Sequence, residues 1–323
     1  MPKVGMITTG ITGCWHTSTS RVAEMDMRVL ITGGTGFIGR ALCPLLSSAG
    51  HELSVLTRDA ERAAKTLPGV QTIEHLDQAS DIDAIVNLAG EPLAEGRWTD
   101  KKKELIRQSR IGTTRELLQW IERQPAAQRP RVLVSGSAIG YYGAHDDAPL
   151  DEDAPPGDDF SAQLCRDWEA AATDAQALGL RVALVRTGVV LGRDGGAMAK
   201  MVPAFKLGAG GPMGDGQQWM SWIHRHDLVR LMQWLLEHET ASGAYNGTAP
   251  TPVRNCEFAQ TLGQVLGRPS LLTTPAIVLK LMFGEMSTLL LTGQRILPAR
   301  AQAQGFGFDY PTLEAALHDV LNR

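Results

Sequence analysis

Three glycines near the start of the chain have the spacing of a phosphate-binding turn. In the segment 31–40, Gly33, Gly36 and Gly39 satisfy the pattern Gly-x-x-Gly-x-x-Gly, and Gly34 also completes Gly-x-Gly-x-x-Gly. Glycine permits a tight turn and a close approach of the backbone to a pyrophosphate, and the free N–H groups at the start of the next helix attract negative charge. The alternative is a turn with a structural role alone. The residues expected to hold the phosphates of a dinucleotide are Gly33, Gly36, Phe37, Ile38 and Gly39.

The next polar residues indicate which dinucleotide is bound. After a second apolar run, Glu52–Leu56, the chain continues with Thr57 and Arg58, at the place where an acidic residue would bind the ribose 2′-hydroxyl of NAD. A guanidinium binds phosphate through charge-assisted hydrogen bonds, so Thr57 and Arg58 favour NADP(H). The alternative is that Arg58 is an ordinary surface residue and that Asp59 caps a helix starting at Glu61.

Strand and helix patterns place the glycine turn in an α/β domain. Apolar runs predict strands over 28–32, 52–56, 84–88, 131–135 and 181–186. Helical spacing of apolar residues predicts helices over 37–48, 104–123 and 162–178. Alternating strands and helices are typical of a doubly wound parallel sheet of the Rossmann type. Its ligands bind beyond the carboxyl ends of the strands, where Gly33, Ala89, Ser137 and Thr187 fall.

The chain divides into three predicted parts. Residues 27–192 form the NADP-binding Rossmann domain. The Gly-rich stretch 208–216 and several prolines then predict a smaller C-terminal substrate lobe over 193–323, which can return a strand and a helix to the sheet. Residues 1–26 lack the apolar segment of a signal peptide, and we expect either a disordered extension or a mis-assigned start before Met27.

Composition excludes several classes of function. A net charge of -4 provides no basic surface for nucleic acid. The apolar stretch 276–291 contains Lys280 and Glu285, so it lacks the roughly 20 apolar residues that span a bilayer. The four cysteines form no Cys-x-x-Cys pair and predict neither a metal site nor disulfides. The run 101–103, three lysines, is interpreted as a solvated helix face. We therefore expect a cytoplasmic protein with a small-molecule substrate and a homodimer as one possible assembly.

Several segments agree, in order, with a known superfamily. They are Asn87-Leu88-Ala89-Gly90, Ser135-Gly136-Ser137 and Trp222-Ile223-His224-Arg225-His226-Asp227-Leu228. Over residues 27–323 the chain resembles the extended and atypical short-chain dehydrogenase/reductases. A further set resembles an uncharacterised "epimerase family" branch with a C-terminal domain of unknown function. This set comprises Arg97-Trp98-Thr99, Ser109-Arg110, Gly140-Tyr141-Tyr142-Gly143, Asp167-Trp168-Glu169, and Gly284-Glu285 through Gly293-Gln294-Arg295. The resemblance implies that Leu88, Ala89, Gly90, Arg110 and Cys165 lie near the cofactor and that Ser137 lies in the active site.

The chain departs from this superfamily at its usual proton donor, a tyrosine followed four residues later by a lysine. The four tyrosines are Tyr141, Tyr142, Tyr245 and Tyr310, and the residues four positions later are His145, Asp146, Ala249 and Glu314. Aligning the superfamily's downstream glutamate with Glu169 places Ser161 and Cys165 at the two positions of the dyad. A tyrosine without a nearby ammonium group keeps a pKa of about 10 and is a poor base at neutral pH.

Ser137, Tyr141 and Tyr142 are the candidate catalytic residues that remain. Ser137 either bonds a substrate carbonyl or ends its strand, and the two tyrosines either donate a proton or form the cleft wall. We also expect Arg97, His224 and Asp227 to face the cleft; for His224 and Asp227 the alternative is that they hold a loop in place. Trp98 is expected to pack against its neighbours. Cys165 is by default a buried apolar group. The sequence thus predicts an NADP(H)-dependent oxidoreductase or epimerase-like protein for a small polar or sugar-derived substrate. The alternative is a non-catalytic NADP(H)-binding sensor or scaffold.

Overall fold

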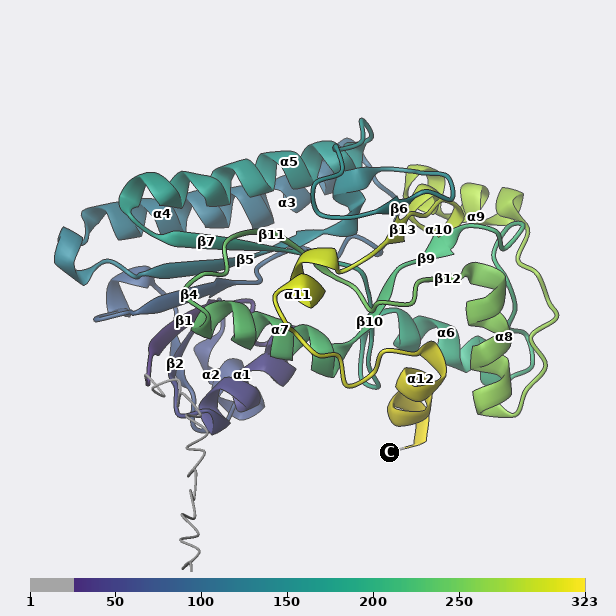
Figure 1. The fold of residues 1–323 in the computed structure, drawn as a ribbon, viewed down its shortest axis with the longest axis horizontal. Coiled ribbons are helices and arrows are strands. Elements are labelled where there is room, and N and C mark those ends of the chain that lie inside the picture. Colours follow the sequence, from purple (N-terminus) through teal and green to yellow (C-terminus); the bar gives the residue numbers. More distant parts are fainter. Residues whose placement is uncertain (1–25, 323) are drawn as a thin grey trace, which may run out of the picture.

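A seven-stranded parallel sheet forms the centre of the molecule (Figure 1). The computed structural model describes residues 26–322, so the expectation for residues 1–26 lies, except for Asp26, outside the described residues. The strand order is β11-β7-β5-β4-β1-β2-β3, and every neighbouring pair is parallel. The strands are β1 (Arg28–Thr32), β2 (Glu52–Leu56), β3 (Gln71–Ile73), β4 (Ala84–Asn87), β5 (Val132–Ala138), β7 (Arg181–Thr187) and β11 (Gly243–Gly247). The predicted Rossmann-type fold is confirmed. The chain direction across the sheet reverses between β1 and β4, the point at which such sheets bind ligands.

Helices cover both faces of this sheet (Figure 1). On one face α1 (Gly39–Ser48) packs beside α7 (Arg225–Glu237), and on the other lie α4 (Thr113–Arg123) and α5 (Phe160–Thr173). Along β1, Val29 and Ile31 belong to the core beneath α1 and α7, whereas Leu30 belongs to the core beneath α4. Because both faces are buried, the central strands β1 and β4 are apolar over most of their length rather than alternating with polar residues.

Two predicted helices are divided in the structure. The predicted helix 104–123 consists of α3 (Asp100–Arg107), the π-helical turn η2 (Gln108–Gly112) and α4. The predicted helix 162–178 consists of α5 and the 3-10 turn η5 (Asp174–Leu178). A π-turn inserts one residue without ending the helix, so apolar spacing alone does not reveal it. The helix after the glycines begins at Gly39 rather than at Phe37.

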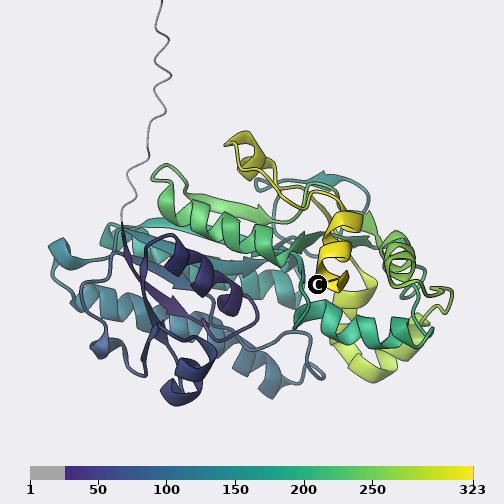
Figure 2. The same ribbon diagram turned by 90° about the horizontal axis from the view of Figure 1, so that it is seen from below.

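A C-terminal lobe lies beside the sheet, whereas some of the remaining short elements, such as α2 (Ala60–Thr66), lie within the sheet domain (Figure 2). The core of the lobe includes Trp222, Phe258 and Leu317. Short strand pairs are β8 (Val189–Leu191) with β10 (Trp222–His224), β9 (Trp219–Met220) with β12 (Val253–Arg254), and β6 (Pro149–Leu150) with β13 (Arg295–Ile296). The other helices are α2 (Ala60–Thr66), α6 (Gly196–Lys206), α8 (Asn255–Leu266), α9 (Ala276–Phe283), α10 (Thr288–Leu291), α11 (Ala299–Ala303) and α12 (Leu313–Asn322), with the 3-10 turns η1 (Leu76–Gln78), η3 (Ala126–Gln128), η4 (Ile139–Tyr142) and η6 (Gly284–Ser287).

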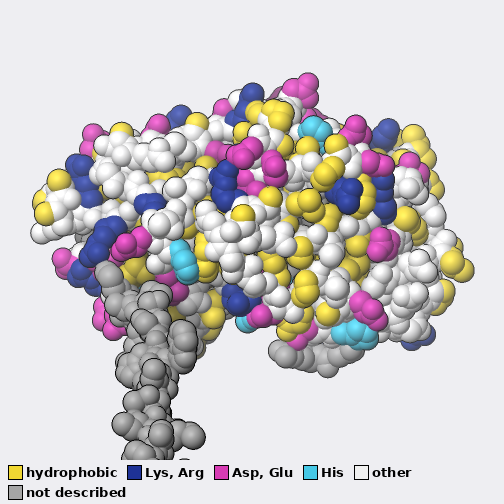
Figure 3. Space-filling view, in the orientation of Figure 1, with side chains coloured by type: hydrophobic (Ala, Val, Ile, Leu, Met, Phe, Trp, Pro, Cys, Tyr) yellow, Lys and Arg dark blue, Asp and Glu magenta, His cyan; other side chains and the backbone are white. Residues whose placement is uncertain are grey.

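The surface carries charges of both signs, interspersed on the face drawn in Figure 3. The interpretation of the lysine run as a solvated face was wrong for two of its members. Lys102 pairs with Glu91 at 2.7 Å, and Lys103 pairs with Glu285 at 2.6 Å. These partners lie 11 and 182 residues away, and the second is out of reach of any local pattern.

Within residues 26–322, no helix is long and apolar enough to cross a membrane.

Candidate functional site

The glycine turn between β1 and α1 is packed so closely that side chains are excluded. Gly33 has φ +70°, and a Cβ atom there would lie 2.6 Å from the carbonyl oxygen of Leu88. A Cβ atom on Gly39 would lie 2.4 Å from the carbonyl oxygen of Gly34. Gly36 is exposed and has only the carbonyl oxygen of Gly33 nearby, at 3.1 Å. The turn is therefore rigid on its inner side and open above Gly36.

The first amides of α1 are left without protein acceptors. The amide of Gly36 donates to Gly33 and that of Arg40 donates to Gly36, each at 3.0 Å. In the described chain the amides of Phe37 and Ile38 have no acceptor. Ile38 provides no side-chain cap, and the first turn of α1 contains no acidic residue. Unsatisfied N–H groups and the positive end of the helix dipole make this point suited to an anion.

The side chain of Phe37 links the glycine turn to the C-terminal lobe. Cβ atoms built on Gly192 and Gly195 would lie 2.8 Å and 2.5 Å from the ring of Phe37. The guanidinium carbon of Arg225 lies 4.7 Å from the centre of this ring. Phe37 therefore offers a ligand its amide, whereas its ring is already covered by the chain.

The end of β2 carries a free guanidinium. Arg58 is exposed, and no described residue forms an ion pair or hydrogen bond with it. Asp59 caps α2, because its carboxylate accepts a hydrogen bond from the amide of Arg62 at 2.9 Å. Thr57 is half-buried, and its hydroxyl bonds to the backbone of Asp59. The alternative foreseen here, a cap by Asp59 with Arg58 on the surface, is therefore present, although α2 begins at Ala60 rather than Glu61, and it leaves the guanidinium of Arg58 open to a ligand.

A relay of hydrogen bonds connects the end of β4 with the π-turn. The hydroxyl of Thr32 accepts from the amide of Ala89 at 3.1 Å and donates to Asn87 at 2.6 Å. The side-chain amide of Asn87 donates to Thr114 at 2.9 Å, and Thr114 donates to the carbonyl oxygen of Arg110 at 2.7 Å. The segment Leu88, Ala89 and Gly90 is thus held beside the glycine turn.

Beyond β5 the polar side chains bond to one another. The hydroxyl of Ser137 donates to Glu169 at 2.6 Å. Arg186 donates to both carboxylate oxygens of Glu169, at 2.9 Å each. Tyr142 is fully buried; its hydroxyl donates to Asn246 at 2.6 Å and accepts from Arg186 at 3.0 Å. We call these five residues, Ser137, Tyr142, Glu169, Arg186 and Asn246, the Glu169 network.

The Glu169 network shifts the ionisation of its members. Burial raises the pKa of Tyr142 to about 12, although Arg186 and Asn246 act in the opposite direction. Burial lowers the pKa of Arg186, but the bonds and charge of Glu169 outweigh it and raise the pKa above its usual value. Tyr142 is therefore neutral at physiological pH and is shielded from ligands by its zero exposure.

Tyr141 lies at the edge of this network. It is half-buried, and the guanidinium carbon of Arg186 lies 3.5 Å from the centre of its ring. The hydroxyl of Tyr141 makes no hydrogen bond within the described residues. Of the two predicted tyrosines, Tyr141 is thus the one with accessible surface.

The positions that the dyad would occupy are covered by the turn η4. Ser161 and Cys165 are 6% and 2% exposed. A Cβ atom on Gly140 would lie 3.0 Å from Cβ of Ser161 and 3.9 Å from Sγ of Cys165. Burial, followed by the charge of Glu169, raises the pKa of Cys165 to about 12, so the thiol is neutral.

The remaining polar candidates hold the structure together. Asp227 is fully buried, and its carboxylate accepts from the amides of Asp309 and Tyr310 at 2.9 Å each. His224 is 6% exposed and lies 3.4 Å from Asp319. The expectation that these two face a cleft was wrong, because both bind the segment that precedes α12 or α12 itself.

The side chains of Arg97 and Trp98 are also held by contacts within the protein. Arg97 donates to the carbonyl oxygens of Leu281 and Met282 at the end of α9, so its guanidinium caps that helix instead of facing a cleft. Trp98 is 8% exposed and packs edge-on against Phe160, with ring centres 5.1 Å apart. The packing role expected for Trp98 is confirmed.

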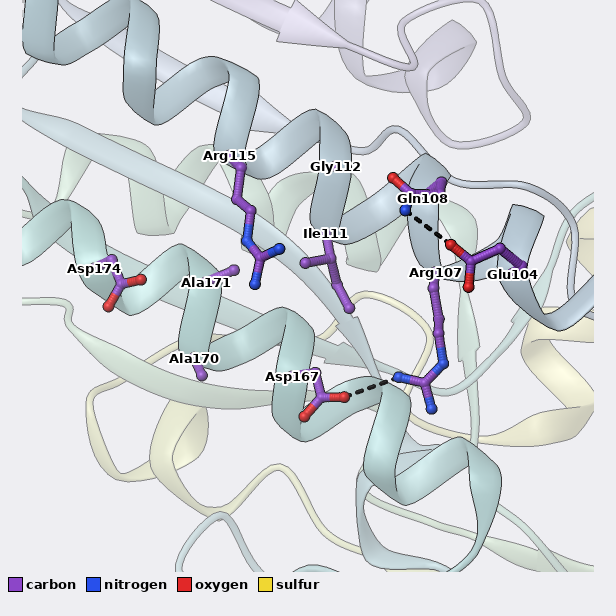
Figure 4. Close-up of a pocket in the computed structure, with 10 residues that line it drawn as sticks. All are labelled: Glu104, Arg107, Gln108, Ile111, Gly112, Arg115, Asp167, Ala170, Ala171 and Asp174. Atoms are coloured by element: carbon purple, nitrogen blue, oxygen red, sulfur yellow. Dashed lines mark hydrogen bonds and ion pairs between the residues drawn. The ribbon is translucent and has the colours of Figure 1, made fainter.

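Two cavities lie away from the glycine turn. One, of about 380 Å³, lies between the α3–η2–α4 segment and α5, where Arg107 binds Asp167 at 2.9 Å (Figure 4). The other, of about 480 Å³, lies in the C-terminal lobe beside Lys280 and Ser287. Neither is lined by a predicted site residue.

Sequence reasoning did not foresee that Arg186 and Asn246 complete the Glu169 network. A signal was present for Arg186, an arginine near the end of an otherwise apolar strand run that must find an acidic partner when buried. Asn246 lies 104 residues from Tyr142, and no spacing rule connects them.

Comparison with known proteins identifies relatives along the whole fold. The model of the NAD dependent epimerase/dehydratase family matches residues 29–246, and a domain of unknown function, DUF1731, matches residues 274–320. The chloroplastic homolog of epimerase family protein SDR39U1 from Arabidopsis thaliana is 45% identical over 306 residues, which cover 92% of this chain and 88% of that protein.

Two solved structures are similar as well. The human epimerase family protein SDR39U1, crystallised with NADPH, is 39% identical and superimposes with a TM-score of 0.83, covering 92% of this chain and 100% of that chain. The nucleoside-diphosphate sugar epimerase of Corynebacterium glutamicum is 33% identical with a TM-score of 0.73, covering 92% of this chain and 59% of that chain. These findings confirm the predicted resemblance, and with it a nicotinamide dinucleotide as the family's cofactor. The chain belongs to the NAD dependent epimerase/dehydratase family.

Proposed function

We propose that the protein binds NADP(H) across the carboxyl ends of β2, β1, β4 and β5. One observation carries the proposal: the amides of Phe37 and Ile38 lack acceptors in the described chain, and Arg58, which follows the neighbouring strand β2, is exposed and unpaired among the described residues. A pyrophosphate satisfies the amides, and a 2′-phosphate satisfies the guanidinium. The human relative crystallised with NADPH supports this choice of dinucleotide.

The residues present fit such a cofactor. Gly36 leaves space that a Cβ atom would fill, and Gly33 and Gly39 let the backbone close beneath the phosphates. Thr57 and Arg58 hold the adenosine end, whereas Leu88, Ala89 and Gly90 lie along the other half. The bound cofactor would supply a hydride, and the chain must position the acceptor and manage its proton.

We propose an oxidoreductase or epimerase-like reaction on a small polar or sugar-derived substrate, with the C-terminal lobe covering the substrate side. A hydride transferred to a carbonyl carbon leaves negative charge on the oxygen, which requires a proton or a hydrogen-bond donor. Tyr141 is the remaining candidate donor, because Ser137 already donates to Glu169 and Tyr142 is fully buried. The relative titled a nucleoside-diphosphate sugar epimerase supports the sugar class.

The second candidate is an NADP(H)-binding protein without turnover. It is favoured by the Glu169 network, whose polar groups satisfy each other, and by η4, which covers Ser161 and Cys165. In such a protein, binding of the reduced or oxidised cofactor would be the signal itself.

A pair of measurements separates the two candidates. NADPH absorbance is followed at stoichiometric protein with a panel of carbonyl compounds and nucleotide sugars, beside a binding titration. Turnover that falls in Tyr141→Phe but persists in the matched control Tyr142→Phe supports the enzyme and the role of Tyr141. Tight binding with no oxidation across the panel supports the sensor, and turnover unchanged in Tyr141→Phe removes Tyr141 from catalysis.

Two predictions about cellular context stay open to experiment. A cytoplasmic location is expected from the sequence, although the plant relative is named chloroplastic. A homodimer is tested directly by the molar mass of the protein in solution.

A further inference from the structure

The exposed apolar side chains of the protein gather on one part of the C-terminal lobe. Among the described residues nine large apolar side chains are exposed, and eight of them lie within residues 207–289. The most exposed are Leu207 and Leu271, at 85% each, followed by Leu281 at 67%. The ninth, Leu105, lies on α3. Soluble proteins rarely leave a large apolar patch open to water, so this part of the lobe is a surface that another molecule covers.

The helix α9 is apolar on every side. Its eight residues, Ala276–Phe283, include one polar residue, Lys280, and only Leu279 is buried. Ile277 and Leu281, which are four positions apart and therefore share a helix face, are 63% and 67% exposed. A helix that is apolar all round is expected to be buried. The outer side of α9 thus lacks a cover within the described chain.

The loops before α9 join it in one continuous surface. The amide of Gly214 donates to the carbonyl oxygen of Thr274 at 2.9 Å, and a Cβ atom on Gly214 would lie 3.9 Å from Cβ of Ala276. In Figure 1 this part of the lobe lies at the end of the molecule away from β1 and β2. We call it the lobe surface, and it consists of residues 207–215, residues 271–274 and α9.

Two opposite charges on the lobe surface lack ion-pair partners. Lys280 and Asp215 are exposed and line the same cavity of about 480 Å³. The ammonium group of Lys280 binds no described residue, and the carboxylate of Asp215 accepts from the amide of Gln217 alone among them, at 3.0 Å. By contrast, Arg107 and Asp167 at the other cavity bind each other at 2.9 Å (Figure 4). The lobe surface therefore offers one free charge of each sign.

An unpaired cation and an unpaired anion on one face are suited to self-association. A two-fold axis places the same surface of two copies face to face, so that residue i of one copy meets residue j of the other and j meets i. Lys280 of each copy can then meet Asp215 of the other copy. An anionic bilayer or a nucleic acid would be matched by cations alone.

We propose that the lobe surface binds a second copy of this chain in a two-fold dimer. The apolar side chains around α9 of each copy cover those of the other, and Lys280 pairs twice with Asp215 across the axis. Burial of apolar area drives the association, and the two ion pairs fix the register of the copies. The inference is independent of the proposed function, because no residue assigned to the cofactor takes part.

Charge reversal tests both the surface and its symmetry. In Lys280→Glu or in Asp215→Lys, like charges face each other at both contacts, so the dissociation constant of the dimer should rise at least about tenfold. In an equimolar mixture of these two variants, both contacts of the mixed dimer join opposite charges. The dimer should therefore form again with near wild-type affinity. Light scattering over a dilution series gives the molar mass, which distinguishes one chain from two.

An apolar variant and a matched control test the rest of the surface. Leu281→Asp places a charge among the covered apolar side chains and should also raise the dissociation constant of the dimer at least about tenfold. Leu105→Asp changes the exposed apolar residue outside the lobe surface and should leave the constant within about twofold. Circular dichroism and urea unfolding of each variant show that the fold is retained.

Each outcome supports or overturns the assignment. A dimer that is lost in both charge variants and recovered in their mixture supports the pairing of Lys280 with Asp215. A mixture that stays monomeric, or a dimer that persists in both charge variants and in Leu281→Asp, overturns it. A wild-type protein that is monomeric at about 0.1 mM also overturns it, because specific interfaces bind more tightly. Cosedimentation of that monomer with vesicles of anionic lipid, lost in Leu281→Asp, would then assign the surface to a bilayer.

Discussion

The two ends of the proposed cofactor site differ in how far their polar groups are satisfied within the protein. Near β1 and β2, the amides of Phe37 and Ile38 and the guanidinium of Arg58 are left without partners in the described residues. Beyond β5, Ser137 and Arg186 are bonded to Glu169 in a buried network. Buried polar groups that satisfy one another stabilise a fold, whereas donors left open near the surface are available to a ligand. The comparison teaches that the groups near β1 and β2 are open to a ligand, whereas those beyond β5 first stabilise the fold.

The largest expected effect is at the β5 end. Arg186→Met leaves the carboxylate of Glu169 buried without its cation, which should lower the free energy of unfolding by about 3–5 kcal/mol. Arg58→Met, at the exposed end of β2, should change the free energy of unfolding by no more than about 0.5 kcal/mol. Urea unfolding of both variants measures the difference. Equal stability of the two would break the contrast between the ends.

A pH series sharpens the same contrast. The pKa of Tyr142 is raised to about 12 in the folded protein. Because this pKa is higher in the folded than in the unfolded protein, the stability that it contributes is fully present below the unfolded pKa of about 10. That stability is lost as the pH rises through the folded pKa. Between these two pKa values the free energy of unfolding should fall by about 3 kcal/mol, since each pKa unit corresponds to about 1.36 kcal/mol. Urea unfolding at pH 9 and pH 11.5 measures this fall in the free energy of unfolding. In Tyr142→Phe, which has no phenol to ionise, the fall between the two pH values should be smaller than in the wild type. The same slope in both proteins would show that Tyr142 is not the titrating group.

The glycine turn and the open groups near β1 and β2 could be predicted from the sequence, whereas much of the β5 end could not. Gly33, Gly36 and Gly39 act through a local turn, and Arg58 is the second residue after β2, so both signals lie within a few residues. The Glu169 network joins Ser137 to a residue 32 positions away and Tyr142 to one 104 positions away. Such pairs depend on the order of strands in the sheet. The π-turn that contains the buried Arg110 likewise leaves the helical pattern of apolar residues intact.

Within the glycine turn, two substitutions separate binding from stability. A methyl group at exposed Gly36 meets only one backbone oxygen, at 3.1 Å, but occupies the space above the turn. Gly36→Ala should raise the NADPH dissociation constant at least about tenfold, or about 1.4 kcal/mol, and change the free energy of unfolding by less than about 1 kcal/mol. Gly39→Ala, whose methyl group would lie 2.4 Å from a carbonyl oxygen, should lower both affinity and stability. Titrations and urea unfolding of the two variants provide the check; undiminished NADPH binding by Gly36→Ala would place the phosphates elsewhere.

The smallest effect is expected for Ser137→Ala. Glu169 keeps both hydrogen bonds to Arg186, so the loss of the serine hydroxyl should cost about 1 kcal/mol of stability. NADPH affinity should not change. A loss of affinity without a loss of stability would show that Ser137 belongs to the ligand rather than to the network.

The central claim is that the open amides of α1 and the free Arg58 together bind a 2′-phosphorylated dinucleotide. Isothermal titration calorimetry of the purified chain with NADPH, NADP⁺ and NADH, repeated on Arg58→Ala, tests it most directly. We predict binding of NADPH at least about tenfold tighter than NADH in the wild type, since a charge-assisted contact to phosphate is worth about 1.5–3 kcal/mol, and near-equal binding in the variant. Absence of binding heat with NADPH and NADP⁺, or an unchanged preference in Arg58→Ala, would contradict the account.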